Sequence, residues 1–293
     1  EDAYTLALFA QDEIKLLRNL QALIGVRYIY HENFKNHATP NVALMYKPGK
    51  FNFRASYAAG FRTPTLSELY ATDIAKKNDR LTIGNLDLKP EKNNYFSLSA
   101  EYVHERFSVS VNAFYNNIRD MIDYNTIATG DKAMEQYGHK EVRQRDNIAE
   151  AKVHGINVSA NAYLGAGFNL SGGYTHLNTQ DVELEQPIDK SIKNAYNINA
   201  QWAHSWKIYR LNINLNGRFN SKRFSKSYGY APEYQLWNLN TRHSFNLKSV
   251  IIEPGCGMET LFDYMDDRPY NSNYATLTPG RSFYISLSLK FKS

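Results

Sequence analysis

Cysteine is nearly absent from this sequence, since Cys256 is the only one among 293 residues. A single cysteine cannot form a disulfide framework within the chain or a zinc site built from thiolates, so both are excluded. Long apolar runs are also absent: no segment approaches the roughly 18 apolar residues of a membrane-spanning helix, and the mean hydropathy is −0.54. The net charge of +5 is spread along the chain without a basic helix, which disfavours nucleic-acid binding.

Motifs for catalysis are missing as well. The sequence contains no HExxH, Walker, GxSxG or GxGxxG pattern, and its eight histidines show no metal-ligand spacing. Two carboxylate pairs, Asp120 with Asp123 and Asp266 with Asp267, lie in or beside expected loops, where a solvated surface explains them best. We therefore expect no enzymatic activity, no cofactor and no bound metal.

The sequence is rich in alternation between apolar and polar residues. In the last segment, residues 282–291, apolar residues occupy every second position, which predicts a strand with one apolar and one polar face. The clearest case is residues 209–219, where Ile213 belongs to an apolar face suited to lipid. The opposite face must contact water, because it consists of Arg210, Asn212, Asn214, Asn216 and Arg218.

Short and long connections alternate between these segments. Short turns are expected near residues 13–18, 47–50, 104–106, 164–167, 205–207 and 247–250. Longer loops are expected near residues 31–39, 60–93, 117–150, 178–193, 221–233 and 263–280. About 13 strands of about 10 residues with this alternation are typical of an outer-membrane barrel. We therefore predict an all-β fold, a transmembrane antiparallel β-barrel, with a soluble β-sheet as the alternative.

Several motifs resemble those of TonB-dependent outer-membrane receptors. The stretch Phe53–Tyr70, FRASYAAGFRTPTLSELY, resembles the barrel signature of that family, and residues 84–91, GNLDLKPE, resemble its Asn-Pro-x-Leu-Lys-Pro-Glu box with Gly-Asn in place of Asn-Pro. Residues 147–155 resemble a strand segment ahead of a Gly-x-Glu step, and residues 279–283 resemble a closing Pro-Gly-Arg-x-Phe. The motif residues are Gly60, Phe61, Arg62, Pro64, Glu68, Leu69, Tyr70, Pro90, Glu91, Arg281 and Phe291.

The resemblance implies a 22-stranded barrel filled by an N-terminal plug domain. Residues 1–293 would then be the C-terminal portion of the barrel, with the plug absent. The first and last strands are expected to run in the same direction, toward the periplasm, and an odd number of strands cannot close an antiparallel barrel of this kind. No signal peptide is visible, so we expect a fragment of a longer protein, or a second chain or surface lipoprotein that completes the barrel.

The function implied by the resemblance is active import. A receptor in the outer membrane of a Gram-negative bacterium would bind a scarce, small organometallic ligand, with cobalamin or a ferric siderophore favoured, and import it with energy from the TonB complex. A haem receptor of the same family is an alternative. Residues 61–88 lack the histidine that many haem receptors carry there, although His37 and His139 are possible loop ligands. A passive porin is the other alternative. The lipid bilayer and lipopolysaccharide are further expected partners.

Two residue types in the expected loops suit such a ligand. Tyrosine rings can stack on planar or aryl groups, and arginines can hold anionic groups through charge-assisted hydrogen bonds. Thr65 and Glu68 have the spacing of a capping box just after Pro64, which predicts a short helix. The candidate ligand-binding residues are Tyr70, Tyr137, Arg143, Arg145, Tyr228, Tyr230, Tyr264, Tyr270 and Tyr274.

Overall fold

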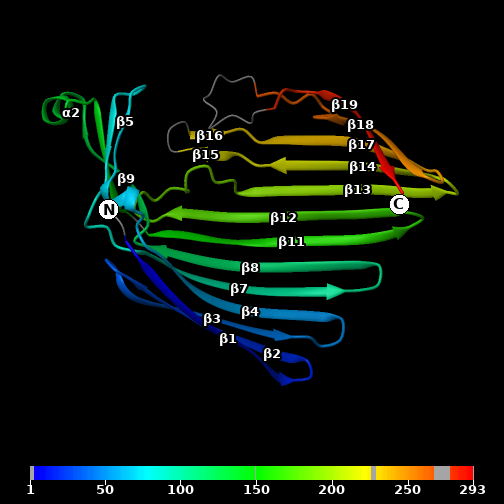
Figure 1. The fold of residues 1–293 in the computed structure, drawn as a ribbon, viewed down its shortest axis with the longest axis horizontal. Coiled ribbons are helices and arrows are strands. Elements are labelled where there is room, and N and C mark those ends of the chain that lie inside the picture. The colour runs from blue at the N-terminus through cyan, green and yellow to red at the C-terminus, as the bar shows by residue number, and fades with distance from the viewer. Residues whose placement is uncertain (1–2, 149, 226–228, 267–277, 293) are drawn as a thin grey trace.

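One large antiparallel sheet dominates the computed structural model, which describes residues 3–292 except 149, 226–228 and 267–277 (Figure 1). The sheet has 13 strands in chain order, which confirms the predicted all-β fold and strand number. The strands are β1 (Thr5–Leu17), β2 (Leu20–His31), β3 (Lys35–Tyr46), β4 (Phe51–Arg62), β7 (Glu91–Val103), β8 (Phe107–Arg119), β11 (Ala151–Gly165), β12 (Phe168–Asp181), β13 (Asn194–Trp206), β14 (Tyr209–Asn220), β17 (Tyr234–Asn246), β18 (Val250–Glu259) and β19 (Ser282–Phe291).

The sequence alternation gives this sheet an apolar face and a polar face. Side chains of register partners on adjacent strands share a face, and one row of the apolar face consists of Leu44, Ala55, Leu98 and Ala113. The polar face is hydrogen-bonded from strand to strand. The Oγ atoms of Ser56 and Ser97 lie 2.6 Å apart, and the Asn199 amide donates to Oδ1 of Asn216 over 2.5 Å. A polar face with these contacts suits a watery lumen.

The two ends of the strands differ, as Figure 1 shows. The N-terminus lies at the end with the long connections, here called the loop rim, and the C-terminus lies at the end with the short turns, the turn rim. β1 and β19 therefore run in the same direction, as predicted. The turns of the turn rim consist of residues 18–19, 47–50, 104–106, 166–167, 207–208 and 247–249.

Two connections near the N-terminus are shorter than the sequence pattern predicts. β1 continues through residues 13–17, within the turn predicted near residues 13–18, and residues 32–34 alone join β2 to β3 in place of a loop over residues 31–39. The polar residues there continue the ladder, since Lys15 pairs with Gln21 and Lys35 with His31. Strand ends that extend past the hydrocarbon layer do not need apolar side chains, so composition alone gave the wrong boundaries.

The long segments that the alternation left as loops contain structure of their own. Four short strands form a second sheet in the order β5-β6-β10-β9, here called the loop sheet, in which β6 and β10 are parallel. Its elements and flanking helices are α1 (Leu66–Tyr70), β5 (Thr72–Ala75), β6 (Arg80–Ile83), β9 (Ile122–Thr129), α2 (Gly130–Tyr137) and β10 (Glu141–Asn147). A hairpin of β15 (Arg223–Ser225) and β16 (Gly229–Ala231) also lies at the loop rim. Neither helix has the length and hydropathy needed to cross a membrane, in the part of the chain described.

Substitutions at Ile213 and Asn214 test the assignment of the two faces. These neighbours on β14 lie on opposite faces, Ile213 on the apolar one. In the full-length protein, Ile213→Arg should sharply lower the yield of folded barrel in outer-membrane fractions, because an arginine at the bilayer midplane costs about 2–4 kcal/mol. Asn214→Ala should cost about 1 kcal/mol or less. Heat-modifiable migration on gels measures the yield, and equal yields for both variants would show that the faces are assigned wrongly.

Candidate ligand-binding site

Arg62, the last residue of β4, anchors the elements of the loop rim. Its guanidinium donates to Glu68 of α1 over 2.9 and 3.2 Å. It also donates to Glu91, the first residue of β7, over 2.6 and 2.8 Å. Each carboxylate thus receives two hydrogen bonds from one planar fork, the geometry in which arginine binds carboxylates most strongly. Three motif residues from separate segments therefore meet in one ion-pair network, here called the Arg62 anchor.

The predicted helix after Pro64 is present as α1, and its capping box is complete. Oγ1 of Thr65 accepts from the Glu68 backbone amide over 3.2 Å, and the Glu68 carboxylate accepts from the Thr65 backbone amide over 2.9 Å. Partial burial by itself would raise the pKa of Glu68, but hydrogen bonds from Arg62 and Thr65 outweigh it and hold that pKa below its ordinary value. Glu68 therefore stays ionised and links α1 to β4.

The second motif box packs against the same helix. A Cβ atom on Gly84 would lie 2.4 Å from the carbonyl oxygen of Leu69, so only glycine fits there. Asn147, at the end of β10, donates to the carbonyls of Lys89 and Asp120 over 2.8 and 2.6 Å and accepts from the Lys89 amide over 2.6 Å. The same segments share a buried apolar cluster, which comprises Leu69, Leu88 and Ile122 with Phe34 packed against it. These contacts fix the position of the loop sheet relative to the large sheet.

One face of the loop sheet carries three arginines around a cavity of about 280 Å³. Arg143 and Arg145 lie two residues apart on β10, so their side chains share one face. Arg80 of β6 is the register partner of Glu141, which lies on that same face two residues before Arg143. The parallel pairing of β6 with β10 thus brings together arginines from segments about 60 residues apart in sequence. The lining residues are Ser67, Ala71, Asp73, Arg80, Thr82, Ile83, Gly84, Tyr124, Arg143 and Arg145.

The three guanidiniums differ in how they are held. Arg145 lies over the Tyr124 ring at 3.7 Å from its centroid and donates to the Tyr124 hydroxyl over 2.6 Å. Arg143 donates through Nε to Glu141 over 2.6 Å. Nε of Arg80 is buried and has no hydrogen-bond partner among the described residues. Asp73 is the one carboxylate that lines the cavity, and Glu141 beside it pairs with Arg143. Three guanidiniums thus face two carboxylates, and the net positive charge suits an anionic group with acceptor oxygens.

Comparison with known proteins shows which family has this architecture. A sequence model for the family "TonB dependent receptor-like, beta-barrel" matches residues 1–255, which include the Arg62 anchor and the arginine cavity. The chain belongs to the TonB-dependent receptor family. Barrels of this family lie in the outer membrane of Gram-negative bacteria and serve transport rather than catalysis, so the predicted family and location are confirmed.

Solved structures of TonB-dependent receptors share this fold. A point mutant of the ferric enterobactin receptor PfeA from Pseudomonas aeruginosa matches 99% of this chain at 20% identity and a TM-score of 0.78. The siderophore receptor PirA from Acinetobacter baumannii matches 99% at 16% identity and a TM-score of 0.78, and the copper transporter OprC matches 97% at 12% identity and a TM-score of 0.76. The chain spans 45%, 46% and 48% of those three proteins, less than half the length of each.

Of the candidate ligand residues that the structure describes, only Arg143 and Arg145 line the cavity. Tyr70 and Tyr137 end α1 and α2 and do not line it. Tyr230 packs edge-on against Phe224 at 5.3 Å, and Tyr264 stacks on Tyr234 at 5.7 Å. Tyr228, Tyr270 and Tyr274 lie outside the described residues.

The sequence pattern missed Arg80 and Tyr124 at this site. The spacing of Arg143 and Arg145 by two residues was an available signal, because such a pair shares one face of any strand. Nothing in the sequence indicates the parallel pairing that adds Arg80.

The two histidines considered for haem are both engaged in other contacts. His139 lies 2.9 Å from Asp79, and this hydrogen bond lowers the pKa of the Asp79 carboxyl. His37 stacks on the Phe61 ring at 3.8 Å, and its Nε2 lies 2.8 Å from the Phe34 carbonyl oxygen. Across the residues that the structure describes, no three His, Cys, Asp or Glu side chains are grouped to hold a metal ion.

Removal of the Arg62 guanidinium should loosen α1. Arg62→Gln in the full receptor leaves two carboxylates close together without their cation. Because the Arg62 side chain is 42% exposed, solvent screens part of this loss, and we expect about 1–2 kcal/mol of local destabilisation. Hydrogen exchange of the Leu69 and Ala71 amides, which bond to Thr65 and Ser67 carbonyls, should accelerate about 5- to 30-fold. Arg54→Gln, on the same strand outside the anchor, is the matched control. Unchanged exchange in Arg62→Gln would contradict the anchoring role.

The lowered pKa of Glu68 makes α1 sensitive to acid. A carboxyl with a lower pKa in the folded form contributes stability above its unfolded pKa, here about 4.5, and that stability is lost as the pH falls through the folded value. After correction for intrinsic exchange rates, protection of α1 amides should stay constant from about pH 6 to 8 and decline below about pH 4.5. Glu68→Gln should remove most of this acid dependence, and an unaltered profile would show that another group causes it.

Proposed function

We propose that residues 1–293 form the C-terminal wall of an outer-membrane receptor that captures an anionic ferric siderophore at the loop sheet and imports it. The observation that carries this proposal is the convergence of Arg80, Arg143 and Arg145 on one cavity. Cavities lined by one sign of charge concentrate ligands of the opposite charge, and low-dielectric walls strengthen the attraction. The cavity thus supports capture of a negatively charged chelate at the loop rim.

The size of the cavity limits what enters it. At about 280 Å³ it is close to the lower bound for small-molecule pockets, roughly 300 Å³. It therefore accommodates one acidic or aryl arm of a chelate, and the remainder would contact the surrounding loops. The ring of Tyr124, held against Arg145, offers a stacking surface for an aryl arm.

Charge favours a ferric siderophore over the other ligands considered. Ferric complexes of catecholate or carboxylate siderophores carry several negative charges, whereas cobalamin carries a single phosphodiester. Haem is disfavoured because His37 and His139 are engaged elsewhere. The PfeA and PirA names, ferric enterobactin receptor and siderophore receptor, agree with the siderophore proposal. Membership of a receptor family disfavours a passive porin.

Import requires parts beyond the strands that the structure describes. Among the described residues, β1 pairs only with β2 and β19 only with β18, and open strand edges in a bilayer leave backbone groups without partners. We therefore propose that further strands complete the barrel, that a plug blocks its lumen, and that the TonB complex drives transport. These strands belong to the same receptor or to a second chain.

The affinity of the full receptor for ferric siderophores tests the proposed site. The double substitution Arg143→Ala with Arg145→Ala removes two charge-assisted donors, each worth about 1.5–3 kcal/mol. Allowing for non-additivity, we expect the Kd for ferric enterobactin or a related ferric catecholate, measured by tryptophan fluorescence quenching, to rise at least tenfold. Lys50→Ala with Arg106→Ala, two exposed cations at the turn rim, is the charge-matched control.

Three outcomes are informative. Weaker binding in the double variant alone supports the arginine site. Equal binding in wild type, double variant and control would place the ligand elsewhere on the receptor. Binding of cyanocobalamin or haem with higher affinity than any ferric siderophore would overturn the proposed ligand class.

A further inference from the structure

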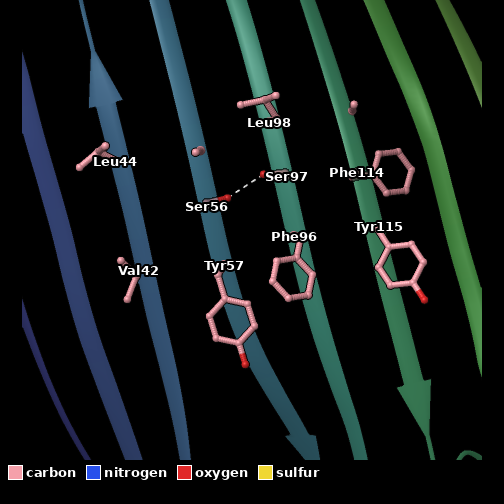
Figure 2. A pocket seen from close by; sticks show the side chains of 11 residues that line it. Val42, Leu44, Ser56, Tyr57, Phe96, Ser97, Leu98, Phe114 and Tyr115 are labelled. Atoms are coloured by element: carbon pink, nitrogen blue, oxygen red, sulfur yellow. Dashed lines mark hydrogen bonds between the residues drawn. The ribbon is translucent and has the colours of Figure 1, made fainter.

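The apolar face contains a wide groove of about 590 Å³ across β3, β4, β7 and β8 (Figure 2). The small side chains of Ala55 and Ala113 form the floor of the groove, and larger side chains surround them. Figure 2 shows the rings of Tyr57, Phe96 and Tyr115 on three adjacent strands, and the Tyr57 and Phe96 rings lie 4.9 Å apart. The walls on the apolar face comprise Val42, Leu44, Tyr57, Phe96, Leu98 and Tyr115.

A cationic patch lies on the same face, directly beyond the groove toward the loop rim. Lys92 of β7 is the register partner of Arg119 of β8, four residues beyond the groove residue Tyr115. Lys152 of β11 is the register partner of Asn117, in the row between Arg119 and Tyr115. Glu150 lies 4.0 Å from Arg119 and 3.9 Å from Lys152. Glu150 thus forms long ion pairs with two of the three cations, and these separations are too long for strong hydrogen bonds. One carboxylate opposes three cations, so the patch keeps a net positive charge that suits an anion.

Between the groove and the row of Lys92 and Arg119 lies a row of hydrogen-bonding groups, at the end of which Lys152 stands. The Tyr57 hydroxyl donates to Oδ1 of Asn94 over 2.8 Å, and Asn94 is the register partner of Asn117. Asn117 is only 9% exposed, and its Oδ1 has no hydrogen-bond partner among the described residues. A buried acceptor without a donor is costly. A ligand with a hydroxyl or amide N–H at this level would satisfy it.

We infer that this surface binds one phosphorylated glycolipid of the lipid A type from the outer leaflet. The order along the strands is cations, then hydrogen-bonding groups, then an apolar groove, which matches phosphate, sugar and acyl chains in turn. Strands lie about 4.8 Å apart, so the cations span about 10 Å and the groove about 14 Å. That width suits a headgroup with two phosphates and several acyl chains better than a two-chain phospholipid. Because these residues lie on the apolar face, the inference is independent of the proposed siderophore site.

Titration of the full-length, delipidated receptor with defined lipids in detergent tests the inference, with native mass spectrometry as the readout. Diphosphoryl lipid A should bind one per receptor, more tightly than monophosphoryl lipid A or phosphatidylglycerol. Loss of a cation near a membrane surface weakens anionic-lipid binding about 5-fold, so Arg119→Gln with Lys152→Gln should weaken it about 25- to 30-fold. Lys50→Gln with Arg106→Gln at the turn rim is the matched charge control.

A second pair of variants tests the groove separately from the charges. Ala113→Leu fills the floor and should weaken binding of lipid A, whereas Ala160→Leu, on the apolar face of β11 outside the groove, should not. Heat-modifiable migration checks that each variant is folded, and Lys152→Gln alone, with an expected loss of about 5-fold, replaces the double variant if that one fails to fold. Equal affinity in all variants, or phosphatidylglycerol binding as tightly as diphosphoryl lipid A, would overturn the inference.

Discussion

Inside a bilayer every backbone N–H and C=O group must find its partner within the protein, because lipid offers none. Within the 13-stranded sheet each strand meets this constraint by pairing with its neighbours, and among the described residues only the outer edges of β1 and β19 stay open. The alternation of side chains follows from it, since one face of each strand meets lipid and the other meets water. Polar side chains such as Asn199 and Asn216 then bond across strands on the wet face. The constraint ends at the loop rim, and there the chain departs from the simple ladder.

At the loop rim, side-chain charges take over the positioning role that backbone pairing has in the membrane. The Arg62 anchor joins β4, α1 and β7 through two carboxylates, and Asn147 ties the end of β10 to the second motif box. The family motifs are therefore architectural. They hold the loop sheet in place, and the residues suited to a ligand, Arg80, Arg143 and Arg145, stand on that sheet rather than in the motifs themselves.

The sequence predicted the parts of this structure that depend on local patterns. The period of two revealed the strands and both faces, and the spacing of Thr65 and Glu68 revealed α1 with its capping box. The loop sheet was missed because β5 and β6 have four residues each, too few to show an alternation. The association of Arg80 with Arg143 depends on a parallel pairing between distant segments, which no local pattern specifies.

The central claim is that the arginines of the loop sheet hold the anionic ligand of an import receptor. It explains why two long segments, rather than remaining open loops, fold together and are fastened to the barrel at Arg62 and Asn147. The most direct measurement is an experimental structure of the full receptor with a ferric siderophore bound. The account predicts ligand oxygens within hydrogen-bond distance of Arg143 or Arg145. A ligand held entirely by other residues, with no atom near these arginines, would contradict it.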